Sequence, residues 1–471
     1  MTIALGAVAL AGCGGSSKPV TPSGLDPASM VPAASLVYAS LSVRPQGTLK
    51  QDLVQVIDEI GGANAATDLV SKVTSGSGSA QTTWSQVKPW LGQRIGAALI
   101  ALPPEQVTAQ SLLNYAVLVL PTTDPKAAGS YLSSKLTHPA ILTYKIVGDY
   151  ALVGGPYAVQ MASAVTSQTS LAASPTYRKL TSQVGQGAFT TLYVRPRPFV
   201  AFETRLLNQE PVPPANLGLI RRSLAKIPVD ASALLTLNAT ASTLRLEYAT
   251  FDATKPGAST HTTSSVAGLP ASSWLALSIG GAFTQGSTIT SLESTLRKLS
   301  TTEASTRLGS ADSSGLQLFT NDVLPALGPM SLSVSGQTKA SVKLGFALTP
   351  ASQSAGDKLL SLVQRMIGKR AEQVKLGHDG DQLVATYGYK SFGEMLAPRS
   401  SLATNPLFRQ ALKQLPPGSS ASVFVNFAPL EAIVKLDHGS ENASAAKVLS
   451  HLDYLIAGAS KGSFQLVLGV K

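Results

Sequence analysis

The sequence has 471 residues, of which 44% are hydrophobic and 13% are charged, a composition that allows more than one buried core and excludes a chain kept unfolded by its own charge. The formal net charge of +11 is spread evenly, because Lys and Arg outnumber Asp and Glu by 18 to 12 in residues 1–250 and by 19 to 14 in residues 251–471. A nucleic-acid-binding protein usually gathers its basic residues on one face, so we expect no nucleic-acid partner.

The chain begins with an apolar run, Met1 to Gly12, that ends in Leu10-Ala11-Gly12-Cys13. A bilayer span takes about 20 residues, so this shorter run is typical of a signal peptide instead, although no Lys or Arg precedes it. The ending matches the lipobox of bacterial lipoproteins, which predicts cleavage between Gly12 and Cys13 and a lipid on Cys13. We therefore expect a signal segment over residues 1–12 and a protein anchored in the cell membrane at its extracytoplasmic face.

Cys13 is the only cysteine in the sequence, so the rest of the chain forms no disulfide and no cysteine-ligated metal site. Residues 13–30 are rich in Ser, Pro and Gly and predict a flexible tether between the lipid and the folded chain. A second stretch of this kind, residues 252–268, predicts a linker near the middle of the sequence.

The segments on either side of this linker share motifs in the same order. The clearest pair is SLAASPTYR (Ser170 to Arg178) and SLATNPLFR (Ser401 to Arg409). Two further pairs are Pro32-Ala33-Ala34-Ser35 with Pro270-Ala271-Ser272-Ser273, and Pro89-Trp90-Leu91-Gly92 with Pro325-Ala326-Leu327-Gly328. We interpret this as an internal duplication that makes two tandem homologous domains, residues 31–251 and 269–471.

Apolar runs of strand type alternate with amphipathic helices along each half. The runs of the first half are Leu36 to Val43, Ile95 to Leu102, Tyr115 to Leu120 and Thr190 to Val194. Apolar positions at helical spacing predict one helix that ends before Gly61-Gly62 and another that ends before Gly368. Leu292, Leu296 and Leu299 predict the second-half counterpart of the helix that ends before Gly61-Gly62. Four dipeptides predict helix starts with a capping residue before a proline: Asp124-Pro125, Ser174-Pro175, Thr349-Pro350 and Asn405-Pro406.

Tight turns between strand-like runs indicate antiparallel pairing. Asp379-Gly380, between two such runs, is a typical hairpin turn. The fold class we expect is therefore α+β, in which each domain is a mainly antiparallel sheet covered by several helices.

Two segments resemble an actinobacterial-type family of exported proteins of unknown function. The first is VPAASLVYASLSVRP (Val31 to Pro45), which an amphipathic helix follows, and the second is VKPWLGQRIGAALIA (Val87 to Ala101). Members of that family begin with a Pro-Ala-Asp-like turn before a strand, where this sequence has Ala34-Ser35 in place of the acidic residue. The resemblance implies export, and it supplies no catalytic residues.

The stretch from His378 to Asp381 (HDGD) places two carboxylates beside a histidine, but we favour the hairpin over a metal site there. None of the five histidines has the spacing of known metal-binding motifs, so we expect no metal and no other cofactor.

The Ser-x-x-Lys pairs Ser223/Lys226 and Ser444/Lys447 match the first motif of penicillin-binding enzymes. The partner motifs S-D-N and K-T-G do not occur in the sequence, nor does a phosphate-binding loop. We therefore expect no catalytic residues and a protein that is not an enzyme, and an exported hydrolase is the least favoured alternative.

Two functions remain. The first is a membrane-anchored lipoprotein that binds or scaffolds another component of the cell envelope. The second is a carrier of a lipid or another apolar ligand, which the low charge and the many aliphatic residues allow. An apolar cavity would favour the carrier, and tightly filled cores with an exposed apolar patch would favour a scaffold for a protein partner.

Overall fold

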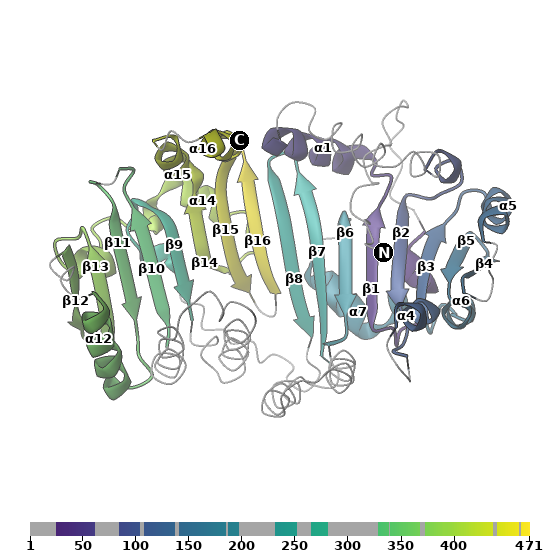
Figure 1. The fold of residues 1–471 in the computed structure, drawn as a ribbon, viewed down its shortest axis with the longest axis horizontal. Helices are drawn as coiled ribbons and strands as arrows, with labels where there is room; N and C mark the ends of the chain where they lie inside the picture. The colour runs from purple at the N-terminus through teal and green to yellow at the C-terminus, as the bar shows by residue number, and fades with distance from the viewer. Residues whose placement is uncertain are drawn as a thin grey trace. The chain divides into compact units, whose positions relative to one another are not determined.

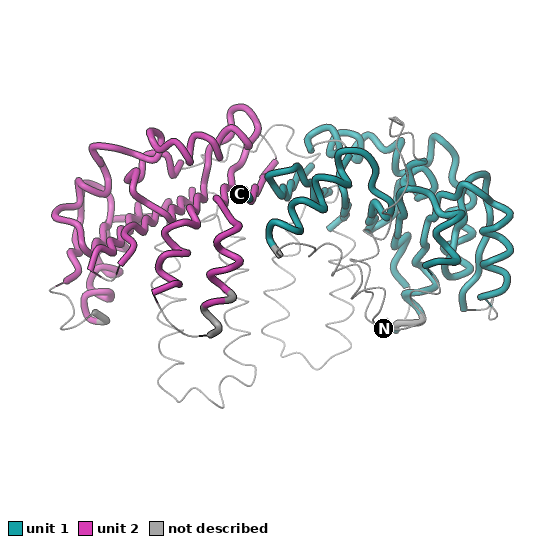
Figure 2. The backbone as a smooth tube through the Cα atoms, turned by 90° about the horizontal axis from the view of Figure 1, so that it is seen from above, with its two compact units in different colours: residues 1–211, 227–256, 470 teal, residues 212–226, 257–469, 471 magenta. Residues whose placement is uncertain are grey.

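The structure of the chain is a computed structural model that describes residues 25–61, 84–103, 108–136, 141–184, 187–196, 231–251, 265–280, 328–338, 340–367, 373–436, 440–460 and 463–471. These residues form helices and antiparallel strands (Figure 1), which confirms the α+β class. The chain divides into two compact units (Figure 2): unit 1 holds residues 1–211, 227–256 and 470, and unit 2 holds residues 212–226, 257–469 and 471.

Unit 1 has an antiparallel sheet with the strand order β4-β5-β3-β2-β1-β6-β7-β8. The strands are β1 (Val37–Ser42), β2 (Arg94–Leu99), β3 (Ala116–Pro121), β4 (Thr143–Val147), β5 (Tyr150–Gly154), β6 (Thr190–Val194), β7 (Ser232–Thr240) and β8 (Thr243–Phe251). Its helices include α1 (Gly47–Gly61), α4 (Ala109–Tyr115), α5 (Pro125–Lys135), α6 (Pro156–Ser163) and α7 (Pro175–Gln183), with the short 3₁₀ turns η2 (Pro27–Met30) and η3 (Leu171–Ala173).

Unit 2 has an antiparallel sheet with the strand order β12-β13-β11-β10-β9-β14-β15-β16, which is the order of unit 1 when β9 is set on β1, β10 on β2 and so on. The strands are β9 (Ser273–Ile279), β10 (Met330–Ser335), β11 (Lys343–Leu348), β12 (Val374–Asp379), β13 (Gln382–Tyr387), β14 (Ser420–Asn426), β15 (Leu452–Ser460) and β16 (Ser463–Val470). Its helical elements include α12 (Gln353–Ile367), α13 (Gly393–Leu396), α14 (Pro406–Leu412), α15 (Phe427–Lys435), α16 (Ser440–Ser450), η4 (Val266–Gly268) and η10 (Leu402–Thr404).

The paired sequence motifs make the same backbone contacts in the two units. In unit 1 an isolated β-bridge joins Pro32 to Ser170, and in unit 2 one joins Pro270 to Ser401. Directly after each bridge, a backbone N–H donates back to the segment before the first strand: Leu171 N to Val31 O at 2.6 Å, and Leu402 N to Leu269 O at 2.8 Å. The motif pairs therefore occupy matching places in the two sheets.

Helix capping follows three of the four predicted dipeptides. Asp124 caps α5, Ser174 caps α7 and Asn405 caps α14, each with Pro at the first helical position. Thr349-Pro350, however, does not begin a helix, so that prediction is wrong. The helix α12 starts later, at Gln353, because Ser352 supplies the capping hydroxyl: its Oγ accepts a hydrogen bond from Ala355 N at 3.2 Å.

The predicted hairpin is confirmed. Asp379 pairs with Gln382 at the end of β12 and β13, and Gly380 has φ +62°, a backbone conformation that favours glycine. The strand over Thr190 to Val194 has the predicted bounds, whereas Tyr115 ends α4 instead of starting β3. The predicted helix over Leu292, Leu296 and Leu299 lies outside the described residues.

Each sheet has a core face that is sealed by the short helical elements. In unit 1 this core contains Tyr38 and Tyr193 from the strands and Tyr177 from α7, and in unit 2 it contains Phe424 from β14 and Phe408 from α14. The two phenylalanine rings are both fully buried and meet edge to face, with centroids 5.2 Å apart. The opposite face of each sheet, which we call the second face, has a smaller core under α5 in unit 1 and under α12 in unit 2.

Candidate functional site

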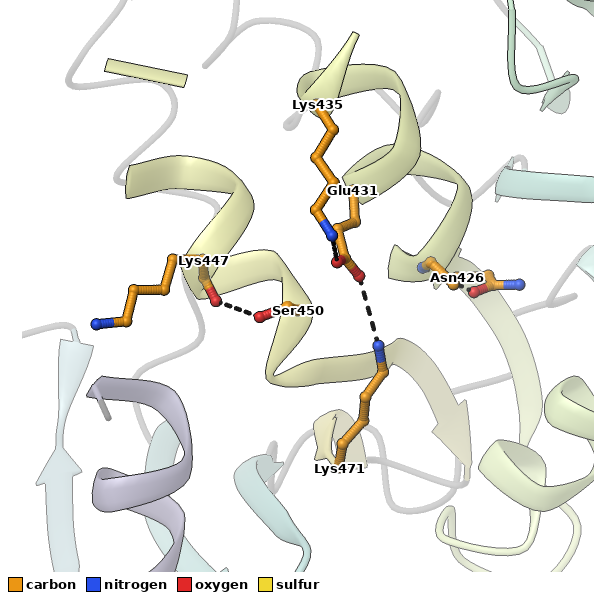
Figure 3. Close-up of polar contacts among 7 residues, drawn as sticks. Asn426, Glu431, Lys435, Lys447, Ser450 and Lys471 are labelled. Carbon is orange, nitrogen blue, oxygen red and sulfur yellow. Dashed lines mark hydrogen bonds and ion pairs between the residues drawn. The ribbon is translucent and has the colours of Figure 1, made fainter. Parts of the chain in front are cut away.

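The predicted lipid-attachment and cleavage residues, Cys13 and Gly12, and the first Ser-x-x-Lys pair, Ser223 and Lys226, lie outside the described residues. The second pair lies on α16, where Lys447 is exposed and its backbone oxygen accepts a hydrogen bond from Ser450 Oγ at 2.7 Å (Figure 3). The Lys447 side chain points away from Ser450. The side chain of Ser444 lies outside the described part of the chain.

The HDGD stretch is part of the β12–β13 hairpin. His378 Nε2 lies 3.1 Å from Asp357 Oδ1, so the imidazole ties β12 to α12. Within the described ranges no three His, Cys, Asp or Glu side chains gather as metal ligands would, and no helix there is long and apolar enough to cross a membrane.

Among the described residues, the most unusual surface is the half of each second face that α5 and α12 do not cover, although α1 contacts β7 of this half in unit 1. An antiparallel sheet with one solvated face usually alternates apolar and polar residues. Here the side chains that alternate with the core residues are apolar too. In unit 1 a cross-strand row runs through Ala39, Leu192, Leu235 and Tyr248, beside the core row that contains Tyr38, Tyr193 and Leu234.

Unit 2 repeats this arrangement on β9, β14, β15 and β16. Ala276, Phe424 and Ile456 are fully buried in the core, whereas Leu277 and Val423, which pair with each other, are half-buried on the second face. We call the following nine residues the open face of unit 2: Leu275, Leu277, Ile279, Val423, Val425, Leu455, Phe464, Leu466 and Leu468. Its counterpart in unit 1, the open face of unit 1, consists of Val37, Ala39, Leu192, Val194, Leu235, Leu237, Leu244, Leu246 and Tyr248.

Helix α15 borders the open face of unit 2. It contacts β9 and β15, the two neighbours of β14, and none of its residues belongs to the core that α14 seals. Seven of its nine residues are apolar (FAPLEAIVK), yet none of them is buried. Apolar helices are normally buried on every side. Leu436, the residue that follows α15, is 60% exposed, which extends this apolar surface to the solvent.

A lysine–glutamate cluster, Glu431, Lys435 and Lys471, lies beside this surface (Figure 3). The Glu431 carboxylate is 2.6 Å from Lys435 Nζ and 3.6 Å from Lys471 Nζ, which ties α15 to the residue after β16. The hydrogen bond from Lys435 is the main cause that holds the pKa of Glu431 below its usual value. Desolvation opposes it, and the positive charges of both lysines add to the lowering.

Two neighbouring groups complete the local electrostatics. Asn426 caps α15, because its Oδ1 accepts a hydrogen bond from Ala428 N at 3.1 Å (Figure 3). Partial burial raises the pKa of Asp453 on β15, and the charge of Lys471 opposes that effect.

The open faces were missed at the sequence level. Their signal is present, because Val423 to Val425 and Leu466 to Leu468 are continuous apolar runs, and such runs are typical of strands that are apolar on both faces. The sequence FAPLEAIVK is likewise too apolar for a solvated helix. Comparisons of the chain with protein-family models, with curated proteins and with solved structures found no match.

Proposed function

We propose that this protein is a lipid-anchored, extracytoplasmic component of the cell envelope that binds a partner and catalyses no reaction. The proposed anchor is a lipid on Cys13, after cleavage behind Gly12. The export implied by the resemblance of Val31 to Pro45 and Val87 to Ala101 to an exported family agrees with this location.

We also propose that the two units arose by duplication of one domain. The identical strand orders and the equivalent bridges Pro32–Ser170 and Pro270–Ser401 support this proposal. Duplication explains why both units carry an open face in the same half of the second face.

The observation that carries the binding function is the apolar open face. Apolar surface that remains in contact with water is unfavourable by about 25 cal/mol per Å², so a partner that covers it binds with a hydrophobic driving force. Contiguous patches of this kind mark sites for apolar ligands or protein partners. The partner is therefore an envelope protein or an apolar small molecule, and nucleic acid is not a candidate because the basic residues are dispersed.

An apolar patch on a surface by itself favours a scaffold for a protein partner, but the side chains of the open faces favour a carrier of a lipid or another apolar ligand. Their side chains are aliphatic almost throughout, whereas interfaces with proteins are usually enriched in aromatic residues and Arg. A second apolar face on each sheet gives two equivalent surfaces for one kind of ligand.

Two experiments test the proposal. Replacing Cys13 by serine should move the protein from the membrane fraction to the soluble exported fraction, and an unchanged membrane fraction would rule out the lipid anchor. Mass spectrometry of the natively expressed protein, purified without detergent, should find a reproducible lipid. Protein that is consistently free of lipid but retains a partner protein would reject the carrier and leave the scaffold.

A further inference from the structure

The exposed hydrophobic side chains of unit 1 are concentrated near α6 and η2. Among the described residues of the unit, the large hydrophobic side chains that are exposed are Leu25, Ile141, Tyr157, Met161 and Tyr248. Tyr248 lies on the open face of unit 1, and we call the other four the entry surface. A single exposed hydrophobic residue is ordinary at a protein surface, whereas several in one region mark an interaction site.

Strand pairing and helix geometry place three of these residues together. The first residue of β4 pairs with the last residue of β5. Ile141 lies two residues before β4, and Tyr157 lies three residues after β5, as the second residue of α6. Met161 follows Tyr157 by one helical turn, so both side chains lie on the exposed side of the helix. The other side of α6 packs into the core through Ala158 and Ala162.

The chain enters unit 1 beside α6. The turn η2 and α6 both contact β3 and both contribute to the core on the same face of the sheet. Pro27 fills space that Gly96 leaves free, because a Cβ on Gly96 would come within 2.6 Å of Pro27 Cβ. The backbone oxygen of Asp26 accepts a hydrogen bond from Tyr150 Oη at 3.2 Å. These contacts hold the chain from Asp26 onward, and Leu25 directly before it is exposed.

The entry surface lies within reach of the proposed lipid anchor. Asp26 follows Cys13 by only 13 positions, and an extended chain of that length spans at most about 45 Å. A lipid on Cys13 therefore keeps this part of unit 1 near the bilayer surface, so that even a weak contact between the two is populated.

We propose that unit 1 rests on the bilayer that holds the Cys13 lipid, with the entry surface in contact with the headgroups and the first part of the acyl chains. This inference rests on the proposed function, because it requires the lipid on Cys13. Tyr157 suits this interface, since its ring is apolar and its hydroxyl can form hydrogen bonds with water and headgroups.

The contact is apolar in origin, because charges of both signs lie beside the entry surface. Lys145 donates a hydrogen bond to Ser163 Oγ of α6 at 3.1 Å, and Asp26 is next to Leu25. We therefore expect the same contact on neutral phosphatidylcholine and on anionic phosphatidylglycerol.

The test measures which side of unit 1 faces the bilayer. Cys13 is the only cysteine in the sequence and would carry the lipid, so an added cysteine supplies a unique thiol for an NBD fluorophore. Met161→Cys places the label on α6, and the control Ser133→Cys places it on α5, which contacts the same strands β4 and β5 from the second face. Both residues are exposed. The lipidated full chain is reconstituted into phosphatidylcholine vesicles that contain a lipid with a nitroxide on its headgroup.

The label on Met161→Cys should show a blue-shifted emission and quenching by the nitroxide lipid, relative to the same variant with Cys13→Ser in solution. The label on Ser133→Cys should show neither effect. Adding Tyr157→Gln to Met161→Cys should reduce the quenching, whereas adding Tyr248→Gln, at an exposed tyrosine of the open face, should leave it unchanged. Circular dichroism of each variant checks that it is folded.

The other outcomes overturn the inference. Equal quenching of the two labels would show that unit 1 has no preferred side, and quenching only with phosphatidylglycerol would show an electrostatic contact. A water-like emission from Met161→Cys, in protein that stays with the vesicles, would overturn the contact and leave the lipid anchor intact. Protein that separates from the vesicles on flotation would overturn the anchor and this inference together.

Discussion

Neighbouring positions on β14 should respond very differently to mutation, because Phe424 points into the core of unit 2 and Val425 lies on its open face. Phe424 is fully buried and meets Phe408 edge to face at 5.2 Å. Phe→Ala changes in cores typically cost about 3–5 kcal/mol, and an aromatic pair adds about 0.5–1.5 kcal/mol to simple burial. We therefore expect Phe424→Ala to lower the free energy of unfolding of unit 2 by about 4 kcal/mol.

The matched change is Val425→Thr, which keeps the shape of the side chain and places a hydroxyl where water already has access. It should alter the free energy of unfolding by no more than about 0.5–1 kcal/mol. Both variants can be followed by urea titration with tryptophan fluorescence, because Trp274 lies on β9, next to β14, and donates a hydrogen bond from Nε1 to Gly336 O at 2.9 Å. Equal destabilisation by the two changes, or a loss below about 1.5 kcal/mol for Phe424→Ala, would show that the two faces are not different environments.

Three further predictions concern the turns, the caps and the charge cluster. Gly328→Ala should destabilise unit 2 by more than about 2 kcal/mol in thermal unfolding, because an added Cβ would collide with the backbone oxygen of Thr349; an unchanged melting temperature would contradict this placement. Asn405→Ala should lower the free energy of unfolding of unit 2 by about 1–2 kcal/mol, because Asn405 both caps α14 and donates a hydrogen bond from Nδ2 to Ala271 O. The variant Asn405→Asp keeps only the cap and should recover part of this loss. The pKa of Glu431 is lower in the folded protein than its ordinary value of about 4.3, so its contribution is fully present above that pH and is lost as the pH falls through the folded-state value. The variant Glu431→Gln should therefore lose less stability than the parent protein as the pH falls. If the urea unfolding midpoints of the two proteins change in the same way between about pH 3 and 7, the ion pairs of Glu431 are contradicted.

Local features of the fold could be predicted from the sequence because their causes are local. Ser174-Pro175 and Asn405-Pro406 carry a capping side chain and a preset φ angle in two adjacent residues, and both begin helices as predicted. Asp379-Gly380 likewise determines its turn through one glycine with positive φ. The helix start predicted at Thr349-Pro350 was wrong for an equally local reason, because Ser352 supplies the capping hydroxyl three residues later.

The candidate site depends on contacts that are distant in the sequence. Nothing near Glu431 indicates that Lys471 reaches its carboxylate, because this contact depends on how β16 ends beside α15. To locate the open faces one must know which side of each strand the helices cover, and a continuous apolar run such as Val423 to Val425 on β14 does not specify a side. Residue types and alternation therefore indicate that both faces are apolar, and only the tertiary fold shows which half α5 and α12 cover.

The position of β1 in the sheet has a consequence for the order in which unit 1 forms. This strand is the first of the unit in sequence, yet it lies between β2 and β6, and the hydrogen bond from Thr190 Oγ1 to Ser40 O joins residues 150 positions apart. The half that contains β1 to β5 involves strands consecutive along the chain, whereas the half with β6 to β8 adds to β1 only after the intervening chain is available. Contacts of such long range are slow to form, because loop closure must precede them. When the chain is synthesised from its N-terminus, one edge of β1 therefore stays unpaired until β6 has been made. An unpaired strand edge can pair with another chain, so unit 1 is most prone to misassembly during this interval.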